Sequence, residues 1–178
     1  MYGGGVNVQL SRDCVGIQIP NGDSMTLEQG HEVYITQVLG GMFTVETEWG
    51  YLVRIDGKDA DALGQTVPEE RQKPNWEQYA SLEEAAWAQL RTCYDPEIPV
   101  NIVELGLVYE LEILGSDLRV QMTLTAPGCG MGEVLKNDIE TKLREIPGIE
   151  TVIIDLTFDP PWSTERMSDA ARLQLGMM

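Results

Sequence analysis

Apolar and polar side chains alternate along much of residues 1–63, and a period of two is typical of β-strands with one buried face. The alternation is clearest at residues 15–19, 33–35, 43–49 and 51–55, with turn residues between several of these runs. Gly40 and Gly41 separate two runs, where a two-residue hairpin turn favours glycine because it requires positive φ. Several short strands without a helical pattern predict a small all-β domain over residues 1–63, either a barrel or a sandwich.

Residues 64–80 lose this periodicity. The segment is polar and contains Pro68 and Pro74, a composition typical of a linker. We therefore place a domain boundary here.

The pattern changes to a helical period in residues 81–178. Ser81 and Glu84 have the spacing of a capping box, and apolar residues then recur at helical spacing over 82–93. Two alternating runs, 107–113 and 118–124, flank a turn and predict a β-hairpin. A second amphipathic helix is predicted over 131–146 and a third strand over 152–158.

The predicted order in this half is therefore helix, strand, strand, helix, strand (αββαβ). Two helices packed on one face of a small three-stranded mixed sheet would bury all of these apolar stripes. The predicted fold class is thus α/β (α+β), preceded by the small all-β domain. Residues 163–175 have helix-forming composition, and we expect them to pack back on residues 81–178 as a short tail.

Acidic residues dominate the charge, since 29 Asp and Glu against 12 Lys and Arg give a net charge of −17. Such a chain repels phosphate backbones and anionic lipid headgroups, so neither nucleic acid nor a membrane is an expected partner. No stretch approaches the roughly 20 apolar residues of a membrane span. The first residues, MYGGG, have neither the basic nor the apolar region of a signal peptide, so we expect a cytoplasmic protein.

Three cysteines and one histidine limit the chemistry. Cys14, Cys93 and Cys129 are widely spaced and odd in number, which does not fit a disulfide framework. Without a Cys-x-x-Cys pair, a closed structural zinc site within one chain is nearly excluded. We expect Cys14 and Cys93 in the core, and His31 to be structural or solvated.

Cys129 differs because it lies in TAPGCGMG at 125–132, between a strand pattern and a helix pattern. The free N–H groups and the dipole of a helix N-terminus favour a thiolate, which is both a metal ligand and a nucleophile. Flanking glycines permit close approach of a bound atom. A buried, inert turn cysteine is the alternative interpretation.

Two further polar loops flank the predicted sheet, DPEIPV at 95–100 and DPPW at 159–162. Prolines stiffen the backbone around Asp95 and Glu97, which suits ligands or partner recognition, although both carboxylates could simply cap a turn. Trp162 could shield a site, anchor a partner or cover the edge of the core. Since two strands end where these loops emerge, we expect the cysteine loop and the Trp162 loop to be neighbours.

Catalysis lacks its usual signatures. A nucleophilic Cys129 would need a base, and the only histidine, His31, lies in the other predicted domain. Neither a phosphate-binding loop nor a dinucleotide fingerprint occurs. We therefore expect a protein that is not an enzyme.

The segments DPEIPV at 95–100, LGLVY at 105–109, TAPGCGMG at 125–132 and DPPW at 159–162 carry a family resemblance. The chain resembles SufT-like members of the metal-sulfur (iron-sulfur) cluster assembly factor family, which are related to PaaD. The β-rich first half and WSTERMSD at 162–169 are similar to the SufT subgroup in particular.

The resemblance implies helices packed on a small sheet and a non-enzymatic role in maturing iron-sulfur proteins. It makes Cys129 the reactive or cluster-linked residue, with the loop of Asp95 and Glu97 beside it. The implied cofactor is a transient iron-sulfur cluster or iron, and the implied partners are scaffold or carrier proteins and clients.

A cluster normally has four ligands and this site has one thiol, so a homodimer, Asp95 or Glu97, or an external thiol would complete it. Two other hypotheses stay open. One is an adaptor that recruits clients through its acidic surface and Trp162 without binding metal. The other is a cysteine nucleophile for sulfur or acyl transfer.

Overall fold

The computed structural model describes residues 5–72, 74–95, 98–126 and 130–177. The chain divides into two compact units, Met1–Pro74 and Asn75–Met178. No helix in the described part of the chain combines the length and the apolar character that crossing a bilayer requires.

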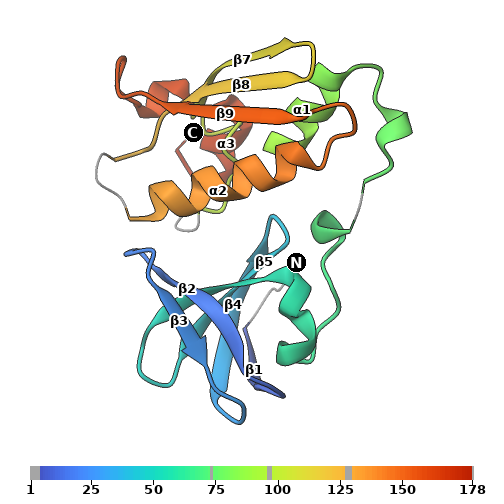
Figure 1. Cartoon of the computed structure of the whole chain (residues 1–178). Coiled ribbons are helices and arrows are strands. Elements are labelled where there is room, and N and C mark those ends of the chain that lie inside the picture. The colour runs from blue at the N-terminus through green and yellow to red at the C-terminus, as the bar shows by residue number, and fades with distance from the viewer. Residues whose placement is uncertain (1–4, 73, 96–97, 127–129, 178) are drawn as a thin grey trace. The chain divides into compact units, whose positions relative to one another are not determined.

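The first unit is built on a six-stranded antiparallel sheet with the strand order β1-β4-β5-β6-β2-β3 (Figure 1). Its strands are β1 (Val6–Gln9), β2 (Cys14–Ile19), β3 (Ser24–Leu27), β4 (Glu32–Leu39), β5 (Met42–Thr47) and β6 (Leu52–Asp56). The predicted hairpin between β4 and β5 is confirmed, because Gly40 and Gly41 have φ of 60° and 82° and Leu39 pairs with Met42.

Alternate residues of these strands form a core of their own. Val33, Ile35, Val45 and Ile55 are at most 2% exposed and pack in one cluster. A short 3-10 helix, η1 (Gly57–Leu63), adds buried alanines and a leucine to this cluster, so the first unit is not made of strands alone.

An ion pair fastens η1 to the segment before β2. The Arg12 guanidinium donates to both carboxylate oxygens of Asp61, each at 2.8 Å, and to Asp59 at 2.9 Å. The hydrogen bonds from Arg12 lower the pKa of Asp61. A second 3-10 helix, η2 (Glu69–Arg71), is held in a similar way, because Arg71 Nε donates to Asp56 at 2.8 Å.

The second unit has the element order helix, strand, strand, helix, strand. Its main elements are α1 (Leu82–Leu90), β7 (Val108–Leu114), β8 (Asp117–Met122), α2 (Met131–Arg144), β9 (Thr151–Leu156) and α3 (Asp169–Gln174), with short 3-10 helices η3 (Trp76–Gln78) and η4 (Thr164–Arg166). β7 pairs with β8 antiparallel and β9 pairs with β8 parallel, which makes a mixed sheet. Figure 1 shows α1 and α2 on the same side of it.

Local sequence explains where α1 begins. Ser81 Oγ accepts a hydrogen bond from Glu84 N–H at 3.1 Å, and the Glu84 carboxylate accepts one from Ala80 N–H at 2.9 Å. The predicted cap is therefore present, with the glutamate reaching one residue further back than a capping box requires.

A buried polar contact joins the two helices. Gln89 Nε2 donates to the carbonyl oxygen of Lys142 at 2.8 Å, and Lys142 Nζ donates to the carbonyl and hydroxyl oxygens of Thr92 at 2.7 and 2.9 Å. Gln89 and Lys142 are only 6% and 5% exposed. Because buried polar groups are costly without partners, these contacts fix how α1 and α2 pack.

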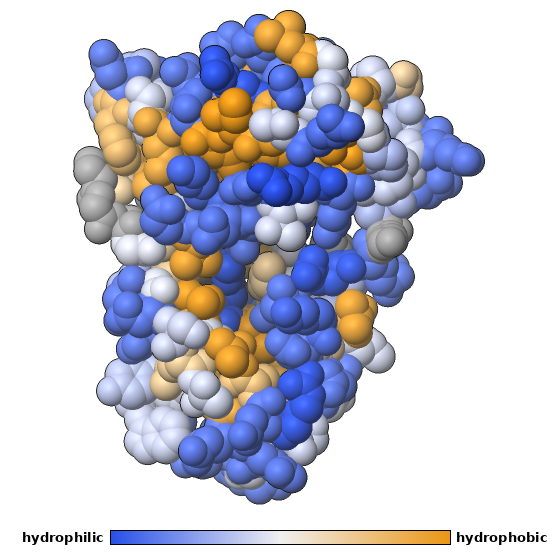
Figure 2. Space-filling model, viewed as in Figure 1, coloured by the Kyte–Doolittle hydropathy of each residue, from blue (hydrophilic) through white to orange (hydrophobic). Residues whose placement is uncertain are grey.

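The sheet of the second unit has one buried and one exposed face. Leu118, Val120 and Met122 of β8 are fully buried, whereas the residues between them are exposed. Hydrophilic residues cover most of the visible surface, and hydrophobic side chains gather on the second unit where β9 runs and in smaller patches on the first unit (Figure 2). The predicted class of mixed α and β structure with a small three-stranded sheet is confirmed.

Ile153 and Ile154 provide a direct test of this two-faced sheet, since they are adjacent and 40% and 7% exposed. Ile154→Ala is expected to lower the free energy of unfolding by about 3 kcal/mol, because it leaves a cavity in the core. Ile153→Ala should cost less than about 1 kcal/mol. Urea denaturation of both variants checks the difference, and equal losses would contradict the assigned faces.

Candidate functional site

Three of the sequence motifs lie at one edge of the three-stranded sheet, the one formed by the ends of its strands. Because β8 and β9 are parallel and β7 is antiparallel to β8, β7 begins at the edge where β8 and β9 end. Thr123 N–H donates to the Leu107 carbonyl at 2.8 Å, and Thr157 N–H donates to the Met122 carbonyl at 2.8 Å. Segments 105–109, 123–126 and 157–162 therefore meet at this edge.

The Asp95 loop leads into this region. Asp95 is half-buried, follows the single bridge between Tyr94 and Asn101, and its carbonyl accepts from Ile98 N–H at 3.2 Å. Asn101 Oδ1 accepts from the N–H groups of Val103 and Glu104, both at 3.0 Å. The loop is thus closed by hydrogen bonds and continues directly into the Leu105–Tyr109 motif.

The Trp162 motif is fastened to the same segment. Trp162 Nε1 donates to the Leu105 carbonyl at 2.7 Å, and the Tyr109 hydroxyl donates to the Pro160 carbonyl at 2.8 Å. The Arg166 guanidinium lies over the Tyr109 ring, 4.4 Å from its centroid, in a cation–π contact. Trp162 is half-buried and packs on the core, so it covers the core edge, one of the three roles expected for it.

α2 begins close to the end of β8. Met131 is 3% exposed, and a Cβ at Gly132 would lie 2.7 Å from Leu124 Cδ1, so a larger residue there would require the Leu124 side chain to shift. Gly130, the N-cap residue, supplies no side-chain hydrogen bond. The first-turn N–H groups of α2 therefore lack the usual side-chain acceptor at the N-cap.

Of the predicted site residues, the structure places Asp95, whereas Glu97 and Cys129 lie outside the described residues. The other two cysteines are core residues, as predicted: Cys14 and Cys93 are 4% and 3% exposed. Burial raises the pKa of the Cys14 thiol, which reduces its thiolate fraction and hence its reactivity. His31 packs edge-on against Trp49, with ring centroids 4.9 Å apart.

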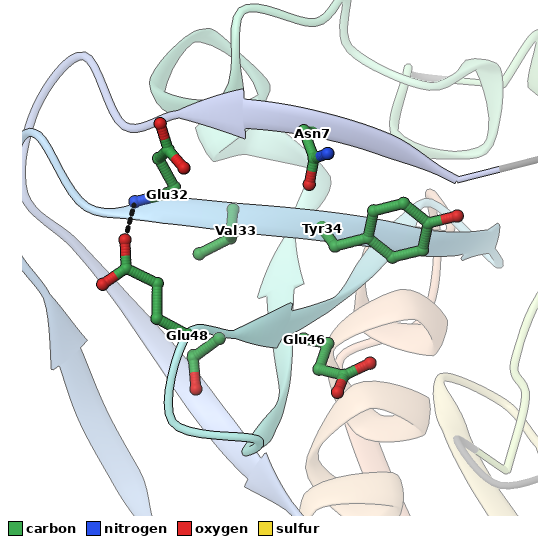
Figure 3. A pocket seen from close by; sticks show the side chains of 7 residues that line it. Asn7, Glu32, Val33, Tyr34, Glu46 and Glu48 are labelled. Atoms are coloured by element: carbon green, nitrogen blue, oxygen red, sulfur yellow. Dashed lines mark hydrogen bonds between the residues drawn. The ribbon is translucent and has the colours of Figure 1, made fainter.

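The first unit carries an acidic hollow that the sequence did not indicate. Glu32 and Tyr34 from β4, and Glu46 and Glu48 from β5 and the turn after it, line a cavity of about 300 Å³ together with Asn7 (Figure 3). The Glu48 carboxylate accepts a hydrogen bond from Glu32 N–H at 3.3 Å. Glu46 and Glu48 stand two positions apart, which places them on one face of a strand, but their meeting with Glu32 depends on the register between β4 and β5.

Within residues 5–72, 74–95, 98–126 and 130–177, no group of three or more His, Cys, Asp or Glu side chains is arranged to hold a metal ion. The glutamates of the acidic hollow do not form such a group. Asp95 belongs to no such group among these residues either.

A mixed sheet with its motifs at one edge is the architecture of a known class of small domain. A DUF59 domain from Bacillus anthracis, seen in a crystal structure, is similar with a TM-score of 0.52 and 33% identity, over 58% of this chain and 100% of that one. Residues 83–156, all within the second unit, match the family model described as iron-sulfur cluster assembly protein.

Two curated relatives support the same family. An Fe-S protein maturation auxiliary factor of Porphyromonas gingivalis (strain ATCC BAA-308 / W83) is 43% identical over 103 residues, which are 57% of this chain and 97% of that protein. The Fe-S protein maturation auxiliary factor SufT of Staphylococcus aureus (strain USA300) is 39% identical over 84 residues, 47% of this chain and 96% of that protein. The chain belongs to the iron-sulfur cluster assembly protein family, and its resemblance to SufT-like proteins is confirmed.

Gly106 tests how closely the C-terminal tail is fastened to the motif edge. It has φ of +78°, and a Cβ there would collide with the carbonyl oxygen of Arg166. Gly106→Ala is therefore expected to lower the free energy of unfolding by at least about 3 kcal/mol.

Gly115→Ala is the matched control, because Gly115 has φ of +63° and open space around its Cβ position. It should lose only about 1–2 kcal/mol, from the positive φ alone. Chemical denaturation measures both variants, and hydrogen exchange of residues 162–168 reports whether the tail is released. Equal losses in the free energy of unfolding would mean that the contact between Gly106 and the tail does not contribute to stability.

Proposed function

We propose that this protein is an accessory factor in iron-sulfur cluster assembly or in cluster transfer to client proteins, and that it acts through Cys129. The observation that carries the proposal is family membership: residues 83–156 match the assembly family, and the Porphyromonas gingivalis relative aligned over 97% of its length is an Fe-S protein maturation auxiliary factor. The cluster is cargo in this proposal, and the partners are the scaffold or carrier that supplies it and the client that receives it.

The start of α2 supports a reactive thiol. Cys129 stands two positions before Met131, the first residue of a 14-residue helix whose N-cap supplies no side-chain acceptor. Free N–H groups and the positive end of the helix dipole favour negative charge close to the helix start. A thiolate is the form that binds iron, so this position suits a cluster ligand.

A short ligand set supports transfer rather than storage. Clusters are usually held by four thiolates, and residues 75–178 contain only one cysteine besides the buried Cys93. Asp95, Glu97, a second chain or the cysteines of the partner would supply the remaining ligands. A cluster held by so few groups of one chain passes readily to a client that offers a fuller set.

The same set of residues supports a non-enzymatic role. Activation of a cysteine nucleophile usually requires a nearby base, most often histidine. The single histidine, His31, belongs to the first unit, where it packs against Trp49. Residues 75–178 contain no histidine, so we propose transfer by exchange of iron ligands rather than catalysis of sulfur or acyl transfer.

An adaptor that recruits clients without binding metal is the second candidate. The acidic character that this candidate uses to recruit clients is present, because the net charge of the chain is −17. Its use of Trp162 loses support, since the indole N–H is already bonded to Leu105 and the ring packs on the core. The two candidates differ in whether the Cys129 thiol is required.

Thiol reactivity separates Cys129 from the core cysteines. Iodoacetamide at near-neutral pH should alkylate Cys129 at least about a hundredfold faster than Cys14 and Cys93, because burial protects those two thiols until the protein opens. Peptide mass spectrometry on native and unfolded protein gives the three rates. Similar rates for all three thiols in the native protein would contradict a distinct reactive Cys129.

Anaerobic reconstitution with iron and sulfide tests the thiol-centred function. Cys129→Ser should keep the fold and reduce bound iron at least about tenfold, since it removes the thiolate that we propose as the iron ligand. Absorption spectra and metal analysis measure the uptake. Maturation of an iron-sulfur client enzyme in cells should fall in the same variant.

Cys93→Ala is the matched control, because it removes a thiol that is 3% exposed and lies in the core. Its iron uptake and client activity should equal those of the unmodified protein. Normal client maturation with Cys129→Ser would reject the thiol-centred function and favour the adaptor.

A further inference from the structure

Four strand edges bound the two described sheets, and three of them carry features that discourage pairing with another chain. β1 and β3 are only four residues long. β7 has a register irregularity between Val108 and Glu110, and its Glu110 and Glu112 are exposed. Short edge strands, bulges and charged side chains are the devices by which sheets avoid unwanted pairing.

β9 is the exception. All six residues, Thr151–Leu156, pair in regular parallel register with β8, and β9 pairs with no other strand in the part of the chain that the structure describes. Its sequence, TVIIDL, contains no lysine, proline or glycine. A regular edge of this kind offers a row of backbone N–H and C=O groups to an added strand.

Apolar side chains accompany this edge. Ile153 is 40% exposed and Phe158, just beyond the strand, is 41% exposed. Figure 2 shows hydrophobic surface along the part of the second unit where β9 runs. An added strand would therefore bury apolar surface as well as form backbone hydrogen bonds.

The charges beside β9 are negative. Glu150, Asp155 and Asp159 are all exposed. Asp155 and Arg119 form a half-exposed ion pair at 3.5 Å, and both line a hollow of about 190 Å³ with Glu110, Glu112 and Gln121. One arginine among these carboxylates leaves the surface acidic, so it favours a basic segment over a second copy of a chain that carries a charge of −17.

We propose that the free edge of β9 is a docking site for an extended, basic segment of a partner protein. The segment adds to the three-stranded sheet as a fourth strand, places apolar side chains against Ile153, and directs lysine or arginine toward Asp155 and Glu150. The site goes beyond the proposed function because it does not depend on the Cys129 thiol.

A synthetic peptide that carries lysine and valine in turn at every second position, with threonine between them, tests the site on the full-length protein, because Ile153 and Asp155 lie on the same face of β9. We expect binding by fluorescence anisotropy, weaker binding at higher salt, and slower hydrogen exchange at residues 151–156 on saturation. A peptide with glutamate in place of each lysine should not bind. Absence of binding by the lysine peptide, or protection elsewhere in the chain, would overturn the proposal.

Two matched variants locate the contact. Ile153→Lys introduces on β9 the charge that natural edges use against pairing, and it should weaken peptide binding at least about tenfold. Leu173→Lys makes the same kind of change at a residue of α3 that is 68% exposed, and it should leave binding unchanged. Equal effects of the two variants would show that added charge, not the β9 edge, governs binding.

Light scattering of the purified protein tests whether a second copy of the chain, rather than a basic partner, binds at the β9 edge. A dimer that the Ile153→Lys substitution abolishes would overturn the proposal of a basic partner. A monomeric protein agrees with the proposal. Client maturation with Cys129→Ser is measured separately, so failure of the β9 site and failure of the thiol-centred function are distinguishable.

Discussion

The parallel pairing of β8 with β9 is the constraint on which the rest of the second unit depends. Parallel neighbours require a crossover connection, and α2 supplies it. The crossover starts where β8 ends, so the beginning of α2 is held at the edge where β9 also ends. Because β7 is antiparallel to β8, the Leu105–Tyr109 motif begins at that edge too.

The C-terminal tail then stabilises this arrangement with contacts that a sheet alone would lack. Trp162 and Tyr109 hydrogen-bond in opposite directions, one side chain donating to Leu105 and the other to Pro160. Ser168 N–H donates to the Glu104 carbonyl at 2.9 Å, and Gln174 Nε2 donates to the Pro99 carbonyl at 2.8 Å. All four acceptors are backbone carbonyls, so the tail fixes the path of the main chain from residue 99 to 109.

Sequence patterns predicted the elements with strong local signals. The Ser81 cap, the hairpin at Gly40 and Gly41, and the apolar stripes of α1, α2 and β9 depend on neighbouring residues, and the structure contains all of them. β1 and β3 were missed because four-residue edge strands have too few alternating positions to be recognised. Their extended conformation comes from pairing with β4 and β2, which are already formed.

Contacts within the candidate site were harder to predict for a related reason. The partner of Trp162 is a backbone carbonyl 57 positions earlier in the chain, and every residue has such a carbonyl. The acidic hollow of Glu32, Glu46 and Glu48 likewise depends on the register between β4 and β5. Burial of Cys14 and Cys93 was predictable because their positions next to or within apolar stripes carry that information locally.

A site with few ligands and a free strand edge place different demands on the protein. One thiolate binds a cluster weakly, which suits release, but weak binding alone gives no choice of recipient. Backbone pairing along β9 with acidic side chains beside it would select a partner by shape and charge, with no cost in cluster affinity. Recognition and release would then depend on separate residues, so each could change without altering the other.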